Sequence, residues 1–205
     1  MISKNQKALF VILRNPVYGK VKTRIAVSRG DQFALNLYNF LLNHTARVIE
    51  PLNYDINLFY SDFIEDIQYF NFPHKKFLQQ GDNLGQRIFN AFDKMFSLGY
   101  GAVIMICSDS YEISTGIINL AFEKINEHDC VIGPAYDGGY YLMGLKQQNE
   151  RIFMNMPWST SEVYEKTFAD LKLQGKSVYS LPMLHDIDIM EDVYNSGLNP
   201  DSIIQ

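Results

Sequence analysis

Two short, unbroken runs of apolar residues constrain the fold more than any other feature of this sequence. They are residues 8–13 (ALFVIL) and residues 102–107 (AVIMIC). Runs of this length without polar alternation are typical of strands that a sheet buries on both faces. Sheets covered on both faces occur in α/β proteins, where helices connect parallel strands. The two runs therefore predict an α/β fold with a mostly parallel central sheet.

The rest of the chain alternates between helical and strand patterns, as this fold requires. Asp31 is a candidate N-cap for the first long helix. We expect helices over 31–49, 83–96, 113–125 and 161–171, strands over 56–60, 130–132, 140–145 and 177–181, and a closing helix from 191. No repeat, long linker or low-complexity tract interrupts the pattern, so residues 1–205 are predicted to form a single domain.

Charge and apolar patterning narrow the class of protein. The chain has 18 Lys and Arg against 23 Asp and Glu, a formal net charge of −5, which argues against a nucleic-acid-binding protein. Its apolar runs fall short of a membrane span or a signal-peptide core, so we expect a cytoplasmic protein. The two cysteines, Cys107 and Cys130, stand in apolar runs and are predicted to be buried thiols.

A basic loop follows the first predicted strand. It carries four cations, Arg14, Lys20, Lys22 and Arg24, together with Gly19, which permits a tight backbone turn. Backbone amides and cationic side chains at the carboxyl end of a strand favour binding of a polyphosphate. The alternative is a solvated basic loop, since the spacing differs from that of a P-loop.

Carboxylates follow two other predicted strands. Asp109 stands directly after the run 102–107, where it either binds a divalent cation or caps the next helix. Asp186 and Asp188 follow the last strand, and their spacing places both on one side of an extended segment. Asp188 is the candidate second metal ligand, and a solvated acidic loop is the alternative.

A third segment, Asp137-Gly138-Gly139, follows the strand over 130–132. Paired glycines let the backbone approach a ligand closely, and Asp137 supplies an acceptor or a general base. An Asp-Gly hairpin turn leading into the strand over 140–145 explains the same residues. Both interpretations can hold at once.

Two weaker patterns complete the candidates. Trp158 precedes Ser159 and Glu162, which have the spacing of a helix capping box, and the indole could also cover a ligand. Gly81 could bring the backbone near a base or sugar, and Arg87 could reach a phosphate.

Taken together, these segments resemble one family. The motifs are, in order, a Pro-x-x-Gly-x-x-Lys-Thr-Arg loop, Gln-x-Gly-x-x-Leu-Gly-x-Arg, a Ser-Asp strand exit, Gly-Pro-Ala-x-Asp-Gly-Gly-Tyr-Tyr-Leu, Trp-Ser-Thr and a closing Asp-x-Asp. They resemble the glycosyltransferase-like family of radical-SAM/selenodomain-associated transferases. That family lies in the nucleotide-diphospho-sugar transferase superfamily, near the molybdenum-cofactor and lactate/phosphoenolpyruvate guanylyltransferases. The resemblance extends over residues 9–193.

The resemblance implies a GT-A type, Rossmann-like, three-layer sandwich and a small-molecule acceptor. Carried over by motif, Gly19, Lys22 and Arg24 would face the nucleotide phosphates, Asp137, Gly138 and Gly139 would line the acceptor or sugar side, and Asp109 with Asp188 would bind Mg²⁺ or Mn²⁺. From the patterns described above, Arg14, Gly81 and Arg87 join the nucleotide-binding candidates and Trp158 joins the acceptor side.

Three functions follow as hypotheses. The first is metal-dependent transfer from a nucleotide sugar, with Asp137 as the base. The second is nucleotidyl transfer to a phosphorylated small molecule, whose anionic nucleophile needs no base. The third is a nucleotide-binding protein with impaired catalysis, because Cys107 and Tyr111 replace the Gly and Pro that the family has around the Ser-Asp exit.

Overall fold

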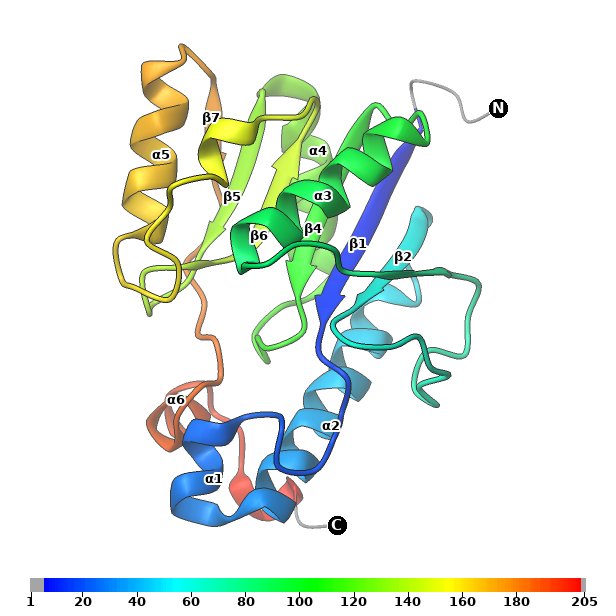
Figure 1. The fold of residues 1–205 in the computed structure, drawn as a ribbon, viewed down its shortest axis with the longest axis vertical. Coiled ribbons are helices and arrows are strands. Elements are labelled where there is room, and N and C mark those ends of the chain that lie inside the picture. Colours follow the sequence, from blue (N-terminus) through cyan, green and yellow to red (C-terminus); the bar gives the residue numbers. More distant parts are fainter. Residues whose placement is uncertain (1–5, 204–205) are drawn as a thin grey trace.

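A seven-stranded sheet forms the centre of the molecule in the computed structural model, which describes residues 6–203 (Figure 1). The strand order is β3-β2-β1-β4-β6-β5-β7. The bounds are β1 Lys7–Leu13, β2 Asp55–Tyr60, β3 Lys75–Leu78, β4 Ala102–Cys107, β5 Cys130–Pro134, β6 Tyr140–Leu145 and β7 Val178–Ser180. Only β6 runs antiparallel to its neighbours, β4 and β5. The α/β fold with a mostly parallel sheet is confirmed.

Helices cover both faces of the sheet, which makes the three layers. The α-helices are α1 Thr23–Arg29, α2 Asp31–Ile49, α3 Leu84–Ser97, α4 Thr115–Glu127, α5 Val163–Leu173 and α6 Met190–Asn195, and short 3₁₀ turns span Glu150–Ile152 and Pro200–Ile203. None of the helices in the described part of the chain is both long and apolar enough to cross a membrane.

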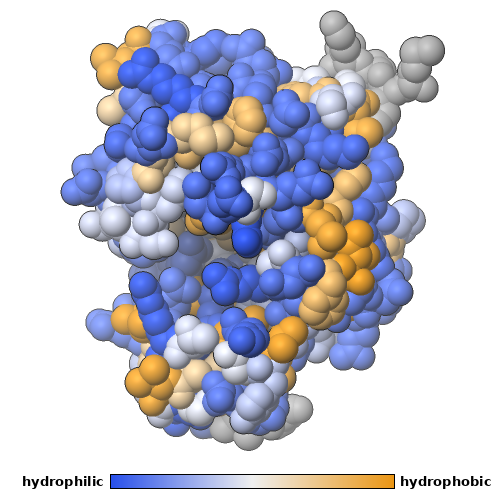
Figure 2. Space-filling model, viewed as in Figure 1, coloured by the Kyte–Doolittle hydropathy of each residue, from blue (hydrophilic) through white to orange (hydrophobic). Residues whose placement is uncertain are grey.

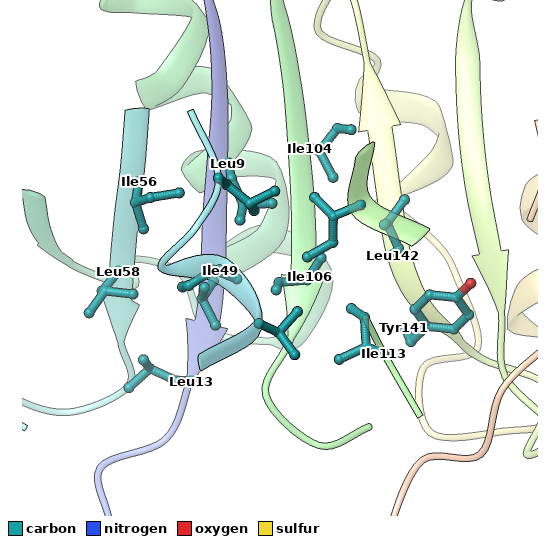
Figure 3. Packing of buried hydrophobic residues seen from close by; sticks show 14 of the residues in the cluster. Leu9, Leu13, Ile49, Ile56, Leu58, Ile104, Ile106, Ile113, Tyr141 and Leu142 are labelled. Carbon is teal, nitrogen blue, oxygen red and sulfur yellow. The ribbon is translucent and has the colours of Figure 1, made fainter. Parts of the chain in front are cut away.

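Each face of the sheet has its own apolar core. On one face, strand residues such as Leu9 and Ile104 pack against α2 and α4 (Figure 3). On the other face, Phe10 and Met105 pack against α3 and α5. Because consecutive residues of β1 enter different cores, a polar residue in this strand would lie inside one of them. This explains why its sequence is apolar without alternation.

A third, smaller core lies outside the sheet. It joins Ile25 of α1, Leu37 and Leu41 of α2, Ile187, and Val193 of α6, together with Leu198 and Ile203. Figure 1 places α1 and α6 beyond the carboxyl ends of the strands. This core packs the segment that contains Lys22 against the segment that contains Asp188, although the two lie far apart in the sequence.

The sequence predictions differ from the structure in several places. The predicted N-cap Asp31 is wrong, because Gly30 is the N-cap of α2 and Asp31 lies in the first turn of the helix. The helix α1 and the strand β3 were not predicted. The predicted capping box of Ser159 and Glu162 is wrong: α5 begins at Val163, its N-cap Glu162 makes no side-chain capping bond, and Ser159 has a positive φ of 65°. Both cysteines are free thiols; Cys130 is buried as predicted, whereas the prediction of a buried Cys107 is wrong, because this residue ends β4 and is half-buried.

Candidate functional site at the carboxyl edge of the sheet

The loops that follow β1, β4, β5 and β7 meet at one edge of the sheet. The amide of Ile187 donates to the carbonyl of Asp109 at 3.0 Å, and the amide of Tyr136 donates to the carbonyl of Leu184 at 3.0 Å. Figure 2 shows that the surface is hollowed between the part that contains the sheet and the part that contains α1 and α6. Ligands of open α/β sheets bind at this edge.

Lys22 lies at the centre of the site. Its Nζ is 3.2 Å from Asp109 Oδ2 and 3.2 Å from Asp188 Oδ1, and its side chain is only 5% exposed. Burial lowers the pKa of Lys22, but the two carboxylates outweigh burial and the pKa lies above its ordinary value. The Lys22 backbone is left-handed, with φ 46°, a conformation that costs a non-glycine residue energy and is frequent at functional sites.

Arg24 extends the charge network toward solvent. Its Nη1 is 3.8 Å from Asp188 Oδ2, and its side chain is 69% exposed. The structure therefore brings together four predicted site residues: Lys22, Arg24, Asp109 and Asp188. Asp109 does not cap α4, because Ser114 does so by accepting a hydrogen bond from the amide of Ile117.

Asp186 is a site residue that the sequence prediction missed. Its Oδ1 is buried without a hydrogen-bond partner in the described part of the chain. Burial, and then the nearby charges of Asp109 and Asp137, raise the pKa of Asp186 to about 8. The sequence shows that Asp186 lies two residues before Asp188, but the prediction names only Asp188 as a metal ligand.

The Asp137-Gly138-Gly139 segment forms a turn between β5 and β6. Asp137 Oδ1 accepts a hydrogen bond of 2.8 Å from the amide of Gly139. At Gly138, with φ +88°, a Cβ would lie 2.1 Å from the carbonyl oxygen of Ser161, so glycine is required here for structural reasons. The turn is confirmed, and an acceptor-binding role for these residues stays a prediction.

Trp158 is anchored by packing. Its Nε1 donates to the carbonyl of Phe153 at 3.1 Å, and its ring lies 6.0 Å from that of Tyr140 in an edge-to-face arrangement. A Cβ on Gly85 would lie 2.4 Å from the indole nitrogen. Position 85 of the Gln-x-Gly-x-x-Leu-Gly-x-Arg motif therefore requires glycine, because α3 approaches Trp158 closely at this residue.

Gly81 and Arg87 stabilise their own loop. Arg87 Nε donates to the carbonyl of Gly81 at 3.1 Å, and Asn83 caps α3 by accepting from the amide of Gln86. Within residues 6–203, no hydrogen bond or ion pair joins these two residues to Lys22, Asp109 or Asp188. Their place in a nucleotide site stays a prediction.

The start of the basic loop is fixed by the hydroxyl of Tyr38. This buried hydroxyl accepts from the amide of Arg14 at 2.8 Å, donates to the carbonyl of Arg14 at 3.0 Å and lies 3.1 Å from Ser108 Oγ. The Arg14 side chain is exposed, and Gly19 turns the loop with φ +70°. Tyr38 therefore ties the exit of β1 to the exit of β4.

Tyr38→Phe is expected to lower the free energy of unfolding by about 1–3 kcal/mol, because the backbone of Arg14 and the buried hydroxyl of Ser108 lose a hydrogen-bond partner. Urea denaturation followed by circular dichroism measures this change. Tyr194→Phe is the matched control, since its hydroxyl is exposed and bonds only Arg29 among the described contacts. Equal stabilities for the two variants would contradict this role of Tyr38.

Comparison with known proteins places the chain in a family. Residues 52–160 match the model of a family described as "uncharacterized protein conserved in bacteria" (DUF2064). The chain belongs to the DUF2064 family. No curated protein matches it.

Solved structures with this fold include the following three proteins. A "putative nucleotide-diphospho-sugar transferase" from Desulfovibrio desulfuricans G20 is 28% identical, with a TM-score of 0.86 over 94% of this chain and 85% of that one. The 4-diphosphocytidyl-2C-methyl-D-erythritol synthase from Anaerococcus prevotii DSM 20548 is 9% identical, with a TM-score of 0.62 over 98% and 97%. The Rv0371c protein from Mycobacterium tuberculosis H37Rv in complex with manganese is 10% identical, with a TM-score of 0.54 over 95% and 98%. The latter two similarities concern the fold alone.

The carboxylates of this DUF2064 protein fit a hard divalent cation. Asp109 Oδ1 is buried and has no hydrogen-bond partner in the described part of the chain. Across residues 6–203, no three His, Cys, Asp or Glu side chains are grouped closely enough to form a complete ligand set. Mg²⁺ is commonly held by one or two carboxylates, with substrate phosphates and water completing its shell. Asp109 and Asp188 fit such a two-carboxylate site.

Two cavities of the protein lie away from this site. One of about 530 Å³ is lined by residues 6–7 and 52–55, where β1 and β2 begin, and one of about 240 Å³ lies between β3 and α3. Neither is lined by Lys22, Asp109 or Asp188. The chemistry of the carboxyl edge, rather than cavity size, therefore identifies the candidate site.

Proposed function

We propose that this protein transfers a group from a nucleotide-activated donor, most simply a nucleotide sugar, to a small-molecule acceptor. The observation that carries the proposal is the convergence of Asp109 and Asp188 on one buried lysine, beside a basic loop at the carboxyl edge of the sheet. The fold shared with the D. desulfuricans protein supports it. Membership of the radical-SAM/selenodomain-associated group and a cytoplasmic location stay predictions from the sequence.

The cations of the first loop would bind the donor phosphates. Arg24 is exposed beside the carboxylates, and Arg14 lies at the start of the same loop. Guanidinium groups match the geometry of phosphate oxygens and stabilise charge that develops on a departing phosphate. A divalent cation at Asp109 and Asp188 would, when bound, neutralise the diphosphate.

The acceptor would approach from the side of Asp137. Residues 134–139, 153–162 and 181–189 contain no Lys or Arg, and their one histidine, His185, is paired with Glu112 at 3.0 Å, so they offer no free cation for a phosphorylated acceptor. An uncharged hydroxyl group must lose a proton as it attacks, and Asp137 is an exposed carboxylate at this edge. These observations favour glycosyl transfer over nucleotidyl transfer to a phosphate.

Asp137→Asn tests that choice. The amide oxygen of asparagine can still accept the hydrogen bond from the amide of Gly139, so the turn is expected to remain. If Asp137 is the base, turnover is expected to fall by about 10²- to 10⁴-fold, as for loss of a general base. Near-normal turnover, measured by product formation, would contradict the base role and favour nucleotidyl transfer.

A donor panel tests the function itself. Thermal shift and product analysis would be run with nucleoside triphosphates and nucleotide sugars, each with and without Mn²⁺. We expect metal-dependent stabilisation by one donor class, followed by turnover when an acceptor is supplied. Binding without a product for every donor and acceptor would favour a nucleotide-binding protein with impaired catalysis. Absence of binding would overturn the proposal.

A further inference from the structure

Both carboxylate oxygens of Asp188 face a cationic side chain. Oδ1 is 3.2 Å from Lys22 Nζ, and Oδ2 is 3.8 Å from Arg24 Nη1. Asp109 is engaged on one side only, through Oδ2, while its buried Oδ1 has no hydrogen-bond partner in the described part of the chain. A divalent cation that bridges the two aspartates needs an oxygen from each. It therefore competes with at least one of the two basic side chains for Asp188.

Lys22 is the stronger competitor of the two. It contacts both aspartates, whereas Arg24 contacts one of them at a longer distance and is mostly exposed. The Lys22 side chain is almost entirely buried. A buried ammonium group that loses its carboxylates needs another anion, because an unpaired buried charge is costly.

We propose that Lys22 couples binding of the divalent cation to binding of the donor phosphates. Lys22 pairs with Asp109 and Asp188 until a divalent cation takes their oxygens, and its ammonium group then pairs with a phosphate of the donor. This inference rests on the proposed function in taking a divalent cation at the two aspartates and a di- or triphosphate as the anion. Each ligand alone has to compete with an existing ion pair, whereas the two together satisfy all the charges. Thermodynamic linkage makes the effect reciprocal, so each ligand strengthens binding of the other.

The test uses the full chain with Mn²⁺ and inorganic pyrophosphate as probes. Electron paramagnetic resonance measures bound Mn²⁺ directly, and the free concentrations are corrected for the Mn²⁺–pyrophosphate complex. For the wild type, saturating pyrophosphate is expected to increase Mn²⁺ affinity by about 5- to 150-fold, the usual range of coupling between sites. For Lys22→Met, Mn²⁺ alone is expected to bind more tightly than to the wild type, and the further increase in Mn²⁺ affinity on adding pyrophosphate is expected to be smaller than in the wild type, because only direct coordination of the phosphate to the cation remains.

Two further variants separate competition from general damage. Lys146→Met removes an exposed cation just after β6, at the opposite edge of the sheet, and is expected to keep the wild-type affinity for Mn²⁺ alone. Lys22→Arg keeps the positive charge and is expected to keep weak binding of Mn²⁺ alone. Mn²⁺ affinity in Lys22→Met equal to or below that of the wild type would overturn the coupling. If the wild type binds Mn²⁺ and pyrophosphate independently, only the coupling fails; if it binds neither, the proposed function fails with it.

Discussion

Asp109→Asn is expected to lower turnover by about 10²- to 10³-fold, a loss comparable with removal of one group that stabilises charge in a transition state. Asparagine has nearly the same shape, so β4 and its exit should keep their structure. The change removes a negative charge from the proposed metal site and one of the two carboxylates that contact Lys22. Turnover of the donor found in the panel, measured over a range of Mn²⁺ concentrations, checks the expectation.

Asp93→Asn is the matched control for this variant. Asp93 lies on the exposed side of α3, so the same change in charge there is expected to leave both turnover and the Mn²⁺ response unaltered. A normal Mn²⁺ response in Asp109→Asn would remove Asp109 from the metal site.

Asp186→Asn is expected to stabilise the protein at neutral and alkaline pH. The pKa of Asp186 is raised from 3.8 to about 8, so between these values the folded chain holds a proton that the unfolded chain releases. The contribution of Asp186 to the free energy of unfolding therefore falls as pH rises from about 4 to about 8, and it is constant above that. The asparagine variant lacks this fall and should exceed the wild type by roughly 3–5 kcal/mol at pH 8.

Urea denaturation at several pH values measures this difference. At pH 4 the two proteins are expected to have nearly equal free energies of unfolding, and the gap should open as pH increases. Asp93→Asn again serves as the control, with a pH profile parallel to that of the wild type. If the difference in free energy of unfolding between the variant and the wild type does not change with pH, Asp186 does not keep its proton in the folded protein.

The sheet was predictable where strands are buried on both faces. β1 and β4 were evident from apolar runs because both of their faces lie in cores. The strand β3 was not, since its residues Lys75–Leu78 are half-buried or exposed at the edge of the sheet and include two lysines. The helix α1 has seven residues and a single buried one, Ile25, which leaves no periodic pattern to detect.

The sequence predicts which residue types form the site, but not which of these residues pair with one another. Asp109 and the basic loop were found because they follow buried strands, where side chains reach the carboxyl edge. Lys22 was assigned to a phosphate, whereas the structure pairs it with Asp109 and Asp188. Sequence shows the charge of a side chain, but a contact across 166 positions depends on the packing of α1 and α6. The lack of a hydrogen-bond partner for Asp186 Oδ1 in the described part of the chain likewise depends on the burial of one atom, which the sequence does not show.

The small core that joins α1, α2 and α6 has a consequence for how ligand affinity can be adjusted. Ile25 and Ile187 of that core are close in sequence to Lys22 and Asp188, whereas Asp109 extends from the main sheet. Local unfolding of this peripheral unit would separate the lysine and one aspartate from the other without disturbing the sheet. Its amide protons should therefore exchange faster than those of β1 and β4, and slow down when ligands bind. Substitutions among these apolar residues would alter affinity through that opening equilibrium, although none of them touches a ligand.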